Sequence, residues 1–186
     1  MPKAVCVYCG ARDGRDPRHA EAAEATGRMI AANGWGLVYG AGDVGLMGRV
    51  ARAHRAAGGR ALGVIPGHLV AREVGQGRLG RDLDRLVVTE TMHERKKVMF
   101  MNADAVLCLP GGAGSLDELF EVLTWRQLGL HEKPILLLDV AGYWEPLLRL
   151  LDHVVAEGFA EPSLLGFVEA AGSVAALEPR LRAALA

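Results

Sequence analysis

The chain has no excess of charge of either sign. Its 186 residues include 21 lysines and arginines against 22 aspartates and glutamates, so composition gives no general attraction for nucleic acid or a charged membrane surface. Any anionic ligand must therefore be held locally. Long apolar runs are also missing, since the longest are of strand length and far below a membrane span. The N-terminal residues lack the features of a secretory signal, so we expect a cytoplasmic protein without a membrane partner.

Cysteine is scarce, and its number is odd. Only Cys6, Cys9 and Cys108 are present, which fits a reduced cytosolic protein better than a disulfide-stabilised one. Cys6 and Cys9 form a C-x-x-C pair, but the redox version of this motif opens a helix, whereas this pair lies along and just past a strand-like segment. A zinc site needs about four ligands, and no second pair exists. The pattern predicts buried or semi-buried structural thiols and no metal site.

Strand-length apolar runs alternate with helix-length segments along the whole chain. With 51% hydrophobic residues, residues 1–186 are predicted to form one domain with one sizeable core. Most runs are continuously apolar, which indicates strands covered on both faces. We predict a Rossmann-like, doubly wound parallel α/β sheet of about seven strands with helices on both faces. The strands are predicted at Ala4–Tyr8, Gly36–Tyr39, Ala61–Ile65, Arg85–Thr89, Ala105–Leu109, Ile135–Leu138 and Phe167–Ala170, and the helices at about 18–33, 45–57, 91–102, 115–129, 143–157 and 174–185.

Ligands of doubly wound sheets bind outside the carboxyl ends of the strands, so the loops that follow strands are the places to search. The least regular of these segments is Gly67–Gly80, which is polar and contains glycine. Two interpretations of it stay open: a lid or binding loop, or a surface connection without a role.

Gly40, Gly42 and Gly45 follow the second predicted strand in the G-x-G-x-x-G spacing of dinucleotide sites. That interpretation also requires an acidic residue about 20 residues further on, at the end of the next strand. No carboxylate stands there, because the strand ends in Val64-Ile65-Pro66-Gly67. We therefore do not expect a dinucleotide. Either the glycines let the backbone at Gly40 and Gly42 approach a ligand or a neighbouring strand, or they allow close packing of helix on strand.

A second glycine-rich loop, Leu109–Glu118, joins a predicted strand to an amphipathic helix. Its glycines leave backbone amides free at a helix N-terminus, an arrangement that binds phosphate. Ser115 is able both to cap the helix and to donate its hydroxyl to an anion. The run Ser115–Glu118 also fits a capping box, in which Glu118 merely satisfies the backbone, and spacing alone favours this cap.

A polar cluster, Thr91–Lys97, follows the strand Arg85–Thr89 in an equivalent position. We expect this strand to neighbour Ala105–Leu109 at about 4.8 Å. Arg95 and Lys96 would then face the same crevice as Glu118. The alternative is that Thr91 and Glu94 form another cap while the basic side chains are solvated.

At these residues the chain resembles the LOG family, the cytokinin riboside 5′-monophosphate phosphoribohydrolases, long mislabelled as lysine decarboxylases. The resemblance spans nearly the whole chain. It rests on the segment Met92–Lys96, the P-G-G-x-G-[ST]-x-x-E pattern of Pro110–Glu118, the glycine loop Gly40–Gly48 and the segment Glu121–Trp125.

The resemblance implies hydrolysis of the N-glycosidic bond of N6-substituted adenosine 5′-monophosphates, and of AMP as a further candidate, to free base and ribose 5-phosphate. It also implies a homodimer that needs neither a metal nor a redox cofactor. Arg95 and Glu118 would be the catalytic pair. The residues expected to bind substrate are Glu73, Met92, Arg95, Lys96, Gly111, Gly112, Ala113, Gly114, Ser115, Leu116, Asp117 and Thr124, together with Gly40 and Gly42 of the first loop.

This chemistry is compatible with the residues. Breaking a C–N glycosidic bond develops oxocarbenium-like charge on the sugar, so a nearby carboxylate stabilises that charge or activates water. Arg95 would orient the carboxylate or hold phosphate with two hydrogen bonds, and the sequence leaves both roles open.

The chain departs from the family pattern at two places. Ser115 stands where threonine is usual, which keeps the hydroxyl. Ala11 and Arg12 follow Cys9-Gly10 where the family usually has a serine pair, so Arg12 is a candidate for a different contact.

Two rival functions are considered. A nucleotide or molybdenum-cofactor carrier would use the same phosphate loop without turnover. Lysine decarboxylation is disfavoured because it usually needs pyridoxal phosphate on a Schiff-base lysine, and this chain has few lysines to offer. They are Lys3, Lys96, Lys97 and Lys133.

Overall fold

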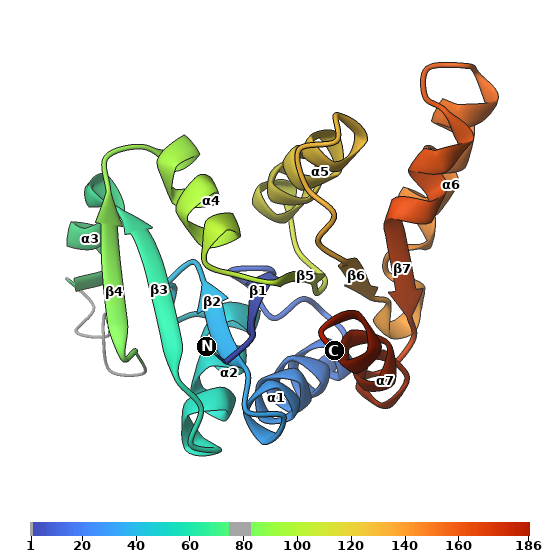
Figure 1. The fold of residues 1–186 in the computed structure, drawn as a ribbon. Coiled ribbons are helices and arrows are strands. Elements are labelled where there is room, and N and C mark those ends of the chain that lie inside the picture. The colour runs from blue at the N-terminus through green and yellow to red at the C-terminus, as the bar shows by residue number, and fades with distance from the viewer. Residues whose placement is uncertain (1, 75–82) are drawn as a thin grey trace.

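The computed structural model describes residues 2–74 and 83–186, with only the backbone of residues 71–74. Within these residues seven strands, all parallel, form one sheet in the order β4-β3-β2-β1-β5-β6-β7 (Figure 1). This confirms the predicted α/β fold. The strands are β1 (Ala4–Tyr8), β2 (Gly36–Tyr39), β3 (Ala61–Pro66), β4 (Arg85–Thr89), β5 (Ala105–Cys108), β6 (Ile135–Leu138) and β7 (Val168–Ala171).

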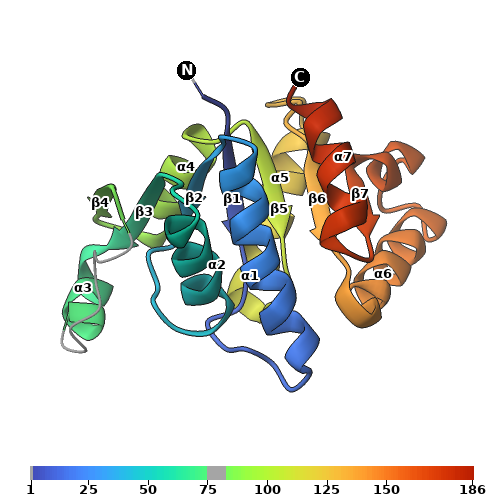
Figure 2. The ribbon, with the colours of Figure 1, turned by 90° about the horizontal axis from the view of Figure 1, so that it is seen from below.

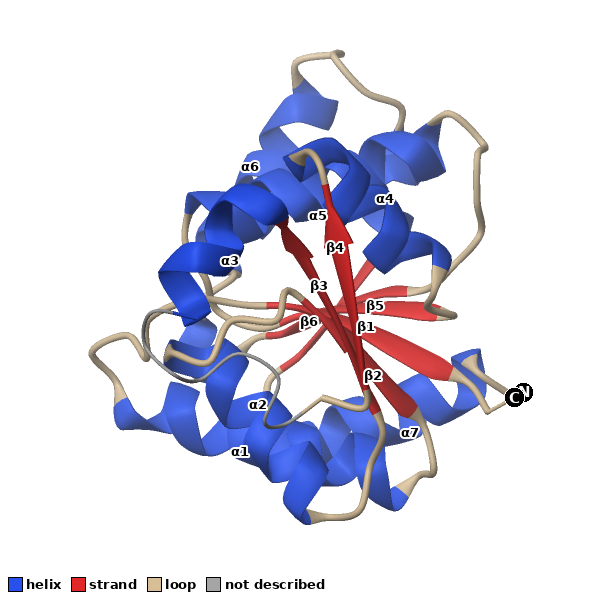
Figure 3. Ribbon diagram, turned by 90° about the vertical axis from the view of Figure 1, so that its left-hand side faces the viewer, coloured by secondary structure: helices blue, strands red, loops and turns tan. Residues whose placement is uncertain are grey.

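Helices cover both faces of the sheet. One layer contains α1 (Pro17–Ala32), α2 (Gly45–Ala56) and α7 (Val174–Ala184), which lie in front of the strands in Figure 2. The other contains α4 (Met92–Met101), α5 (Ala113–Gln127) and α6 (Glu145–Ala156), and Figure 3 shows the strands between the two layers. A separate apolar core fills the space between each layer and the sheet. Every residue of β5 and β6 is buried, which explains why their sequences are continuously apolar.

The predicted ends of the strands and helices lie within two residues of the observed ends. Strand β7 begins one residue later than expected, and α5 begins two residues earlier. The segment Gly67–Gly80 is not irregular throughout, because α3 (Gly67–Val74) lies within it, beside the β4 edge of the sheet (Figure 1). A helix of eight residues is too short to reveal its period in the sequence. The remainder, residues 75–80, lies outside the described residues.

The expected adjacency of β4 and β5 is wrong. The chain steps outward from β1 through β2 and β3 to β4 at the sheet edge, and β5 returns to pair with β1. Helix α4 makes this return across β3, with which it is in contact. Residues that follow β4 therefore reach the centre of the sheet by way of α4. The direction of winding changes between β1 and β5, and ligands of such sheets bind at that switch point.

Two further expectations concern thiols and membranes. Cys6, Cys9 and Cys108 are all free and buried, as predicted. Among the described helices, none combines the length and the apolar character needed to cross a membrane.

Candidate active site

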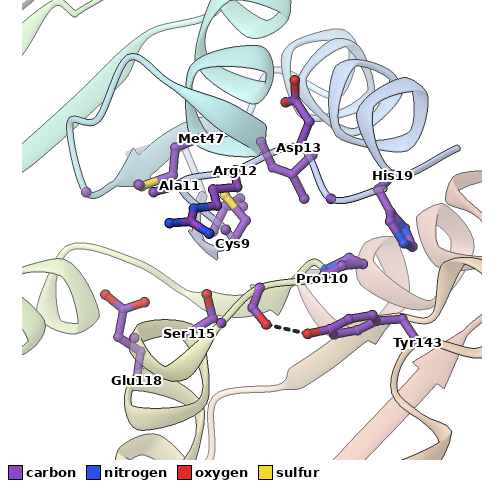
Figure 4. A pocket seen from close by; sticks show the side chains of 18 of the residues that line it. Cys9, Ala11, Arg12, Asp13, His19, Met47, Pro110, Ser115, Glu118 and Tyr143 are labelled. Carbon is purple, nitrogen blue, oxygen red and sulfur yellow. Dashed lines mark hydrogen bonds between the residues drawn. The ribbon is translucent and has the colours of Figure 1, made fainter. Parts of the chain in front are cut away.

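A cavity of about 640 Å³ opens at the switch point, outside the carboxyl ends of β1, β2 and β5. Figure 4 shows its two walls, with Arg12 and Met47 on one side and Ser115 and Glu118 on the other. Apart from Gly40 and Tyr143, the lining residues come from four regions: β1 with the loop after it and the start of α1, the start of α2, helix α4, and the loop from β5 into the first turns of α5. Tyr143, which follows β6, closes one end. The cavity thus lies where the fold class places a ligand.

Backbone hydrogen bonds join three of these loops. The N–H of Gly10 donates to the carbonyl of Pro110 at 3.0 Å, and the carbonyl of Gly10 accepts from the N–H of Met47 at 3.4 Å. Gly45 has φ +59° and lies so close to the Ala11–Arg12 backbone that a Cβ would overlap it. Close backbone packing is therefore the role of Gly45, the third glycine of the first motif.

Arg95 is held at the cavity wall by carbonyl groups. It is 9% exposed. Its Nε donates to the carbonyl of Val64 at 3.1 Å, and its Nη2 donates to the carbonyl of Gly40 at 3.2 Å. These bonds orient the guanidinium so that its remaining nitrogen, Nη1, lies 3.9 Å from Oε1 of Glu118. A Cβ on Gly40 would overlap the guanidinium, so Gly40 makes room for Arg95.

Glu118 projects from the second turn of α5 into the cavity (Figure 4). Burial raises its pKa to about 7, although Arg95 and Lys96 act in the opposite direction. Desolvation penalises the ionised carboxylate, and the guanidinium 3.9 Å away compensates only in part. A carboxyl group that titrates near neutrality is able to exchange protons during a reaction.

The capping box predicted at Ser115–Glu118 is wrong. Helix α5 begins at Ala113, and its N-cap residue, Gly112, makes no side-chain capping bond. Ser115 and Glu118 therefore lie inside the helix, where their side chains line the cavity. In contrast, Thr91 and Glu94 do form a capping box at the start of α4, with reciprocal bonds of 3.1 Å.

The loop into α5 has the form of an anion site. The absence of a capping side chain leaves amides at the helix N-terminus available, and the helix dipole favours negative charge there. A Cβ on Gly111 would overlap Oγ of Ser115. Glycine at this position therefore keeps the serine hydroxyl close to the loop. The Tyr143 hydroxyl donates to the Gly111 carbonyl and supports the loop from the far side (Figure 4).

Lys96 does not face the cavity with Arg95. Its side chain is 5% exposed, and its Nζ lies 2.9 Å from Oδ2 of Asp117 and 3.2 Å from Oε1 of Glu121. Successive residues of a helix point about 100° apart. The two basic residues therefore contact different parts of α5.

The structure brings most of the predicted site residues to the cavity. Those that line it are Gly40, Met92, Arg95, Gly111, Gly112, Gly114, Ser115, Asp117 and Glu118. Among the described side chains, those predicted but found outside its lining are Gly42, Lys96, Ala113, Leu116 and Thr124. The hydroxyl of Thr124 donates to its own helix, at the Phe120 carbonyl. The side chain of Glu73 lies outside what the structure describes.

Sequence reasoning missed part of the lining. His19 packs edge-on against Tyr143, with ring centroids 5.8 Å apart, and both line the cavity, as does Met47. His19 and Tyr143 belong to no motif, and Met47 lies within the glycine loop Gly40–Gly48 but was not singled out. For His19, which follows β1, the usable signal is topological, because the segments after β1 and β5 lie together where the sheet changes direction between them.

Comparison with known proteins identifies relatives over most of the chain. The model of the family described as "Possible lysine decarboxylase" matches residues 47–179. "Cytokinin riboside 5′-monophosphate phosphoribohydrolase LOG7" of Arabidopsis thaliana is 45% identical over 160 residues, which are 86% of this chain and 72% of that protein. The protein of the same description named LOG1, also from Arabidopsis thaliana, is 39% identical over 179 residues, 96% of this chain and 82% of that protein.

The solved structures add a likeness of fold. The molybdenum cofactor carrier protein of Chlamydomonas reinhardtii has a TM-score of 0.76 to this chain at 20% sequence identity, with 100% of this chain and 99% of that one covered. At this level of identity the likeness concerns the fold alone.

Proposed function

The chain belongs to the LOG family of cytokinin riboside 5′-monophosphate phosphoribohydrolases, and on that premise we propose that it hydrolyses the N-glycosidic bond of N6-substituted adenosine 5′-monophosphates. The products are the free base and ribose 5-phosphate. The observation that carries the proposal is the pairing of Arg95 with Glu118 at 3.9 Å inside a cavity that an anion-binding loop borders.

The substrate phosphate is proposed to bind at Gly111–Ser115. Free amides at the start of α5 and the Ser115 hydroxyl are suited to a phosphate oxygen. Glu118 lies one helical turn beyond Ser115 and also lines the cavity. A nucleotide anchored by its phosphate would therefore present its ribose, and the reacting C1′ atom, to the Glu118 carboxylate.

Glu118 is proposed to act in its ionised form. As the C1′–N9 bond breaks, its electron pair goes to the purine and positive charge develops on the ribose, which a carboxylate stabilises. Glu118 takes a proton from the water whose oxygen bonds to C1′, the departing purine takes up a proton from solvent, and Glu118 then releases its proton to solvent. Arg95, fixed by two carbonyls, keeps the carboxylate oriented and its negative charge balanced.

Lysine decarboxylation receives no support from the cavity. Schiff-base chemistry requires a lysine amine at the reacting centre. Lys3, Lys96, Lys97 and Lys133 all lie within the described residues, and none lines this cavity. Lys96 is held by two carboxylates instead.

We also propose that the protein works as a homodimer of single-domain subunits in the cytoplasm and acts on a mononucleotide rather than a nucleic-acid polymer. Large apolar side chains on the outer layer formed by α4 and α5 support a subunit contact there. Met101 is 67% exposed and Phe120 37% exposed. Sedimentation of the wild type and of Met101→Glu would test this proposal, with a shift to monomer expected for the variant.

The direct test of the activity is release of base. The protein is incubated with isopentenyl-AMP and with AMP, and free base is measured by chromatography. Glu118→Gln and Arg95→Ala are expected to lose about 100-fold or more of the rate while remaining folded, and exposed Lys97→Ala serves as control. If neither nucleotide releases free base, the proposal is overturned. Stoichiometric binding of the nucleotide without product would favour a carrier.

A further inference from the structure

Three carboxylates of α5 face two basic residues of α4. Arg95 approaches Glu118 in the cavity, and Lys96 binds the residues on either side of it, Asp117 and Glu121. Asp117 precedes Glu118 directly, whereas Glu121 follows it by nearly one helical turn. The Lys96 ammonium is thus paired with the carboxylates on both sides of Glu118 in the sequence of α5.

We infer that Lys96 is a positioning residue that acts on the substrate only through Glu118, by neutralising the two carboxylates that flank it. The catalytic part of this inference rests on the proposed function. The placement of the residue supports an indirect role, because Nζ is paired with two carboxylates of α5 and the side chain is outside the cavity lining. Its neighbour Arg95, in contrast, lines the cavity.

The ammonium stays charged in this position. Burial lowers the pKa of Lys96, but its bonds to Asp117 and Glu121 outweigh burial, so the net shift is upward. Both carboxylates are therefore paired with a full positive charge at neutral pH. Without that charge, the carboxylate of Glu121, whose side chain is 21% exposed, would lie uncompensated near Glu118 and oppose its ionisation. Solvent screens more of the effect of Asp117, whose side chain is 60% exposed.

Among the residues that the structure describes, the other groups around Glu118 do not replace this effect. Burial raises the pKa values of Cys6, Cys9, Tyr8 and Cys108, so the thiols and the phenol on β1, β5 and the loop after β1 are neutral. On the opposite wall Arg12 is exposed to solvent, which screens its charge. The balance of charge at Glu118 is consequently set by Arg95 and Lys96 against Asp117 and Glu121.

The test compares two substitutions that change the charge near Glu118 in opposite directions. Lys96→Met removes a positive charge and keeps the apolar stem, whereas Glu121→Gln removes a negative charge. Lys96→Arg keeps the charge, and Lys97→Met removes a charge from the adjacent, exposed position. The first readout is the titration of the ¹³C-labelled Glu118 carboxyl by NMR, assigned with Glu118→Gln, which needs no turnover.

We expect the midpoint of the Glu118 titration to rise by about one pH unit in Lys96→Met and to fall in Glu121→Gln. In the double variant that carries both substitutions, the midpoint should lie between those of the two single variants. Lys96→Arg and Lys97→Met should stay near the wild type. The acid limb of kcat/KM for isopentenyl-AMP should move with the NMR midpoint. Failure of the proposed function removes the second readout and leaves the first intact.

Two results would overturn the inference. One is a Lys96→Met variant whose Glu118 titrates as in the wild type while KM rises, because that pattern belongs to a residue that contacts substrate. The other is a shift of the same sign in Lys96→Met and Glu121→Gln, which would indicate a general disturbance of the α4–α5 contact. Circular dichroism and thermal unfolding confirm that each variant is folded before either result is interpreted.

Discussion

The guanidinium of Arg95 occupies the space that a side chain on Gly40 would fill. Nη2 of Arg95 donates to the carbonyl of the same glycine at 3.2 Å, so the residue both accepts from the arginine and gives it room. Gly40 belongs to a spacing that suggests a dinucleotide site, yet here it serves the placement of another side chain. The relationship makes a substitution at Gly40 informative about the placement of Arg95.

Gly40→Ala is expected to reduce kcat/KM by about 100-fold or more, similar to the loss of a catalytic group. The added methyl group displaces the end of a flexible side chain rather than backbone, so the free energy of unfolding should change little. Steady-state rates and chemical denaturation measure the two effects. Gly166→Ala, where a Cβ meets nothing within 4 Å, is the matched control. Equal rates in the two variants would refute the role of Gly40.

The activity should depend on pH through Glu118. Since burial raises its pKa to about 7 and the ionised form is proposed to react, kcat/KM should rise with pH and level off above that value. The rise should be absent from the residual activity of Glu118→Gln. A profile that is flat between pH 5.5 and about pH 8.5 would contradict the assignment.

Glu118 is also expected to lower stability at neutral and alkaline pH. Its pKa is higher in the folded chain than the ordinary 4.5, so the folded state binds more protons between pH 4.5 and about 7 and loses stability as pH rises through that range. The loss is about 3 kcal/mol at most. Glu118→Gln should therefore be more stable than the wild type at pH 8, with a smaller gain at pH 5. Urea denaturation at both pH values measures the difference in the free energy of unfolding. If Glu118→Gln is less stable than the wild type at pH 8, the raised pKa assigned to Glu118 is contradicted.

Part of this arrangement was predictable from the sequence, for physical reasons. Strands such as β5 and β6 are covered on both faces, so their continuous apolar runs set their limits. The order of strands is not a local property, and β4 carries no feature that distinguishes an edge strand from a neighbour of β5. The family resemblance nevertheless paired Arg95 with Glu118, and the structure explains how α4 brings them together.

The position of Lys96 was beyond sequence reasoning. Adjacent basic residues look equivalent in a motif, but the helix turns them to different neighbours, and only the placement of α5 decides what each one meets. The start of α5 was misjudged for a related reason. Ser115–Glu118 has the spacing of a cap, and only the backbone shows that the helix already begins at Ala113.

Arg12 is expected to contribute to recognition of the phosphate. It extends into the cavity opposite Ser115 (Figure 4). The neighbouring acids are engaged elsewhere, since Asp13 pairs with Arg49 and Asp16 with Arg18. Arg12→Ser, which restores the residue usual in the family, should raise KM for AMP several-fold with little change in kcat.

The control for Arg12→Ser is Arg149→Ser, which removes an exposed arginine on α6, outside the cavity lining. The comparison of AMP with adenosine as inhibitors distinguishes charge recognition from general damage. Arg12→Ser should weaken inhibition by AMP and leave inhibition by adenosine unchanged. Equal weakening of both would exclude a phosphate contact.

The hydrogen bonds of Gly10 have a consequence for the cost of binding. Its N–H and carbonyl groups tie the β1 loop to Pro110 on one side and to Met47 on the other without any ligand. These hydrogen bonds therefore hold three walls of the cavity in place relative to one another before a nucleotide binds. These loops lose little conformational entropy on binding, so the cavity is preorganised. More of the free energy of the substrate contacts then contributes to affinity and catalysis.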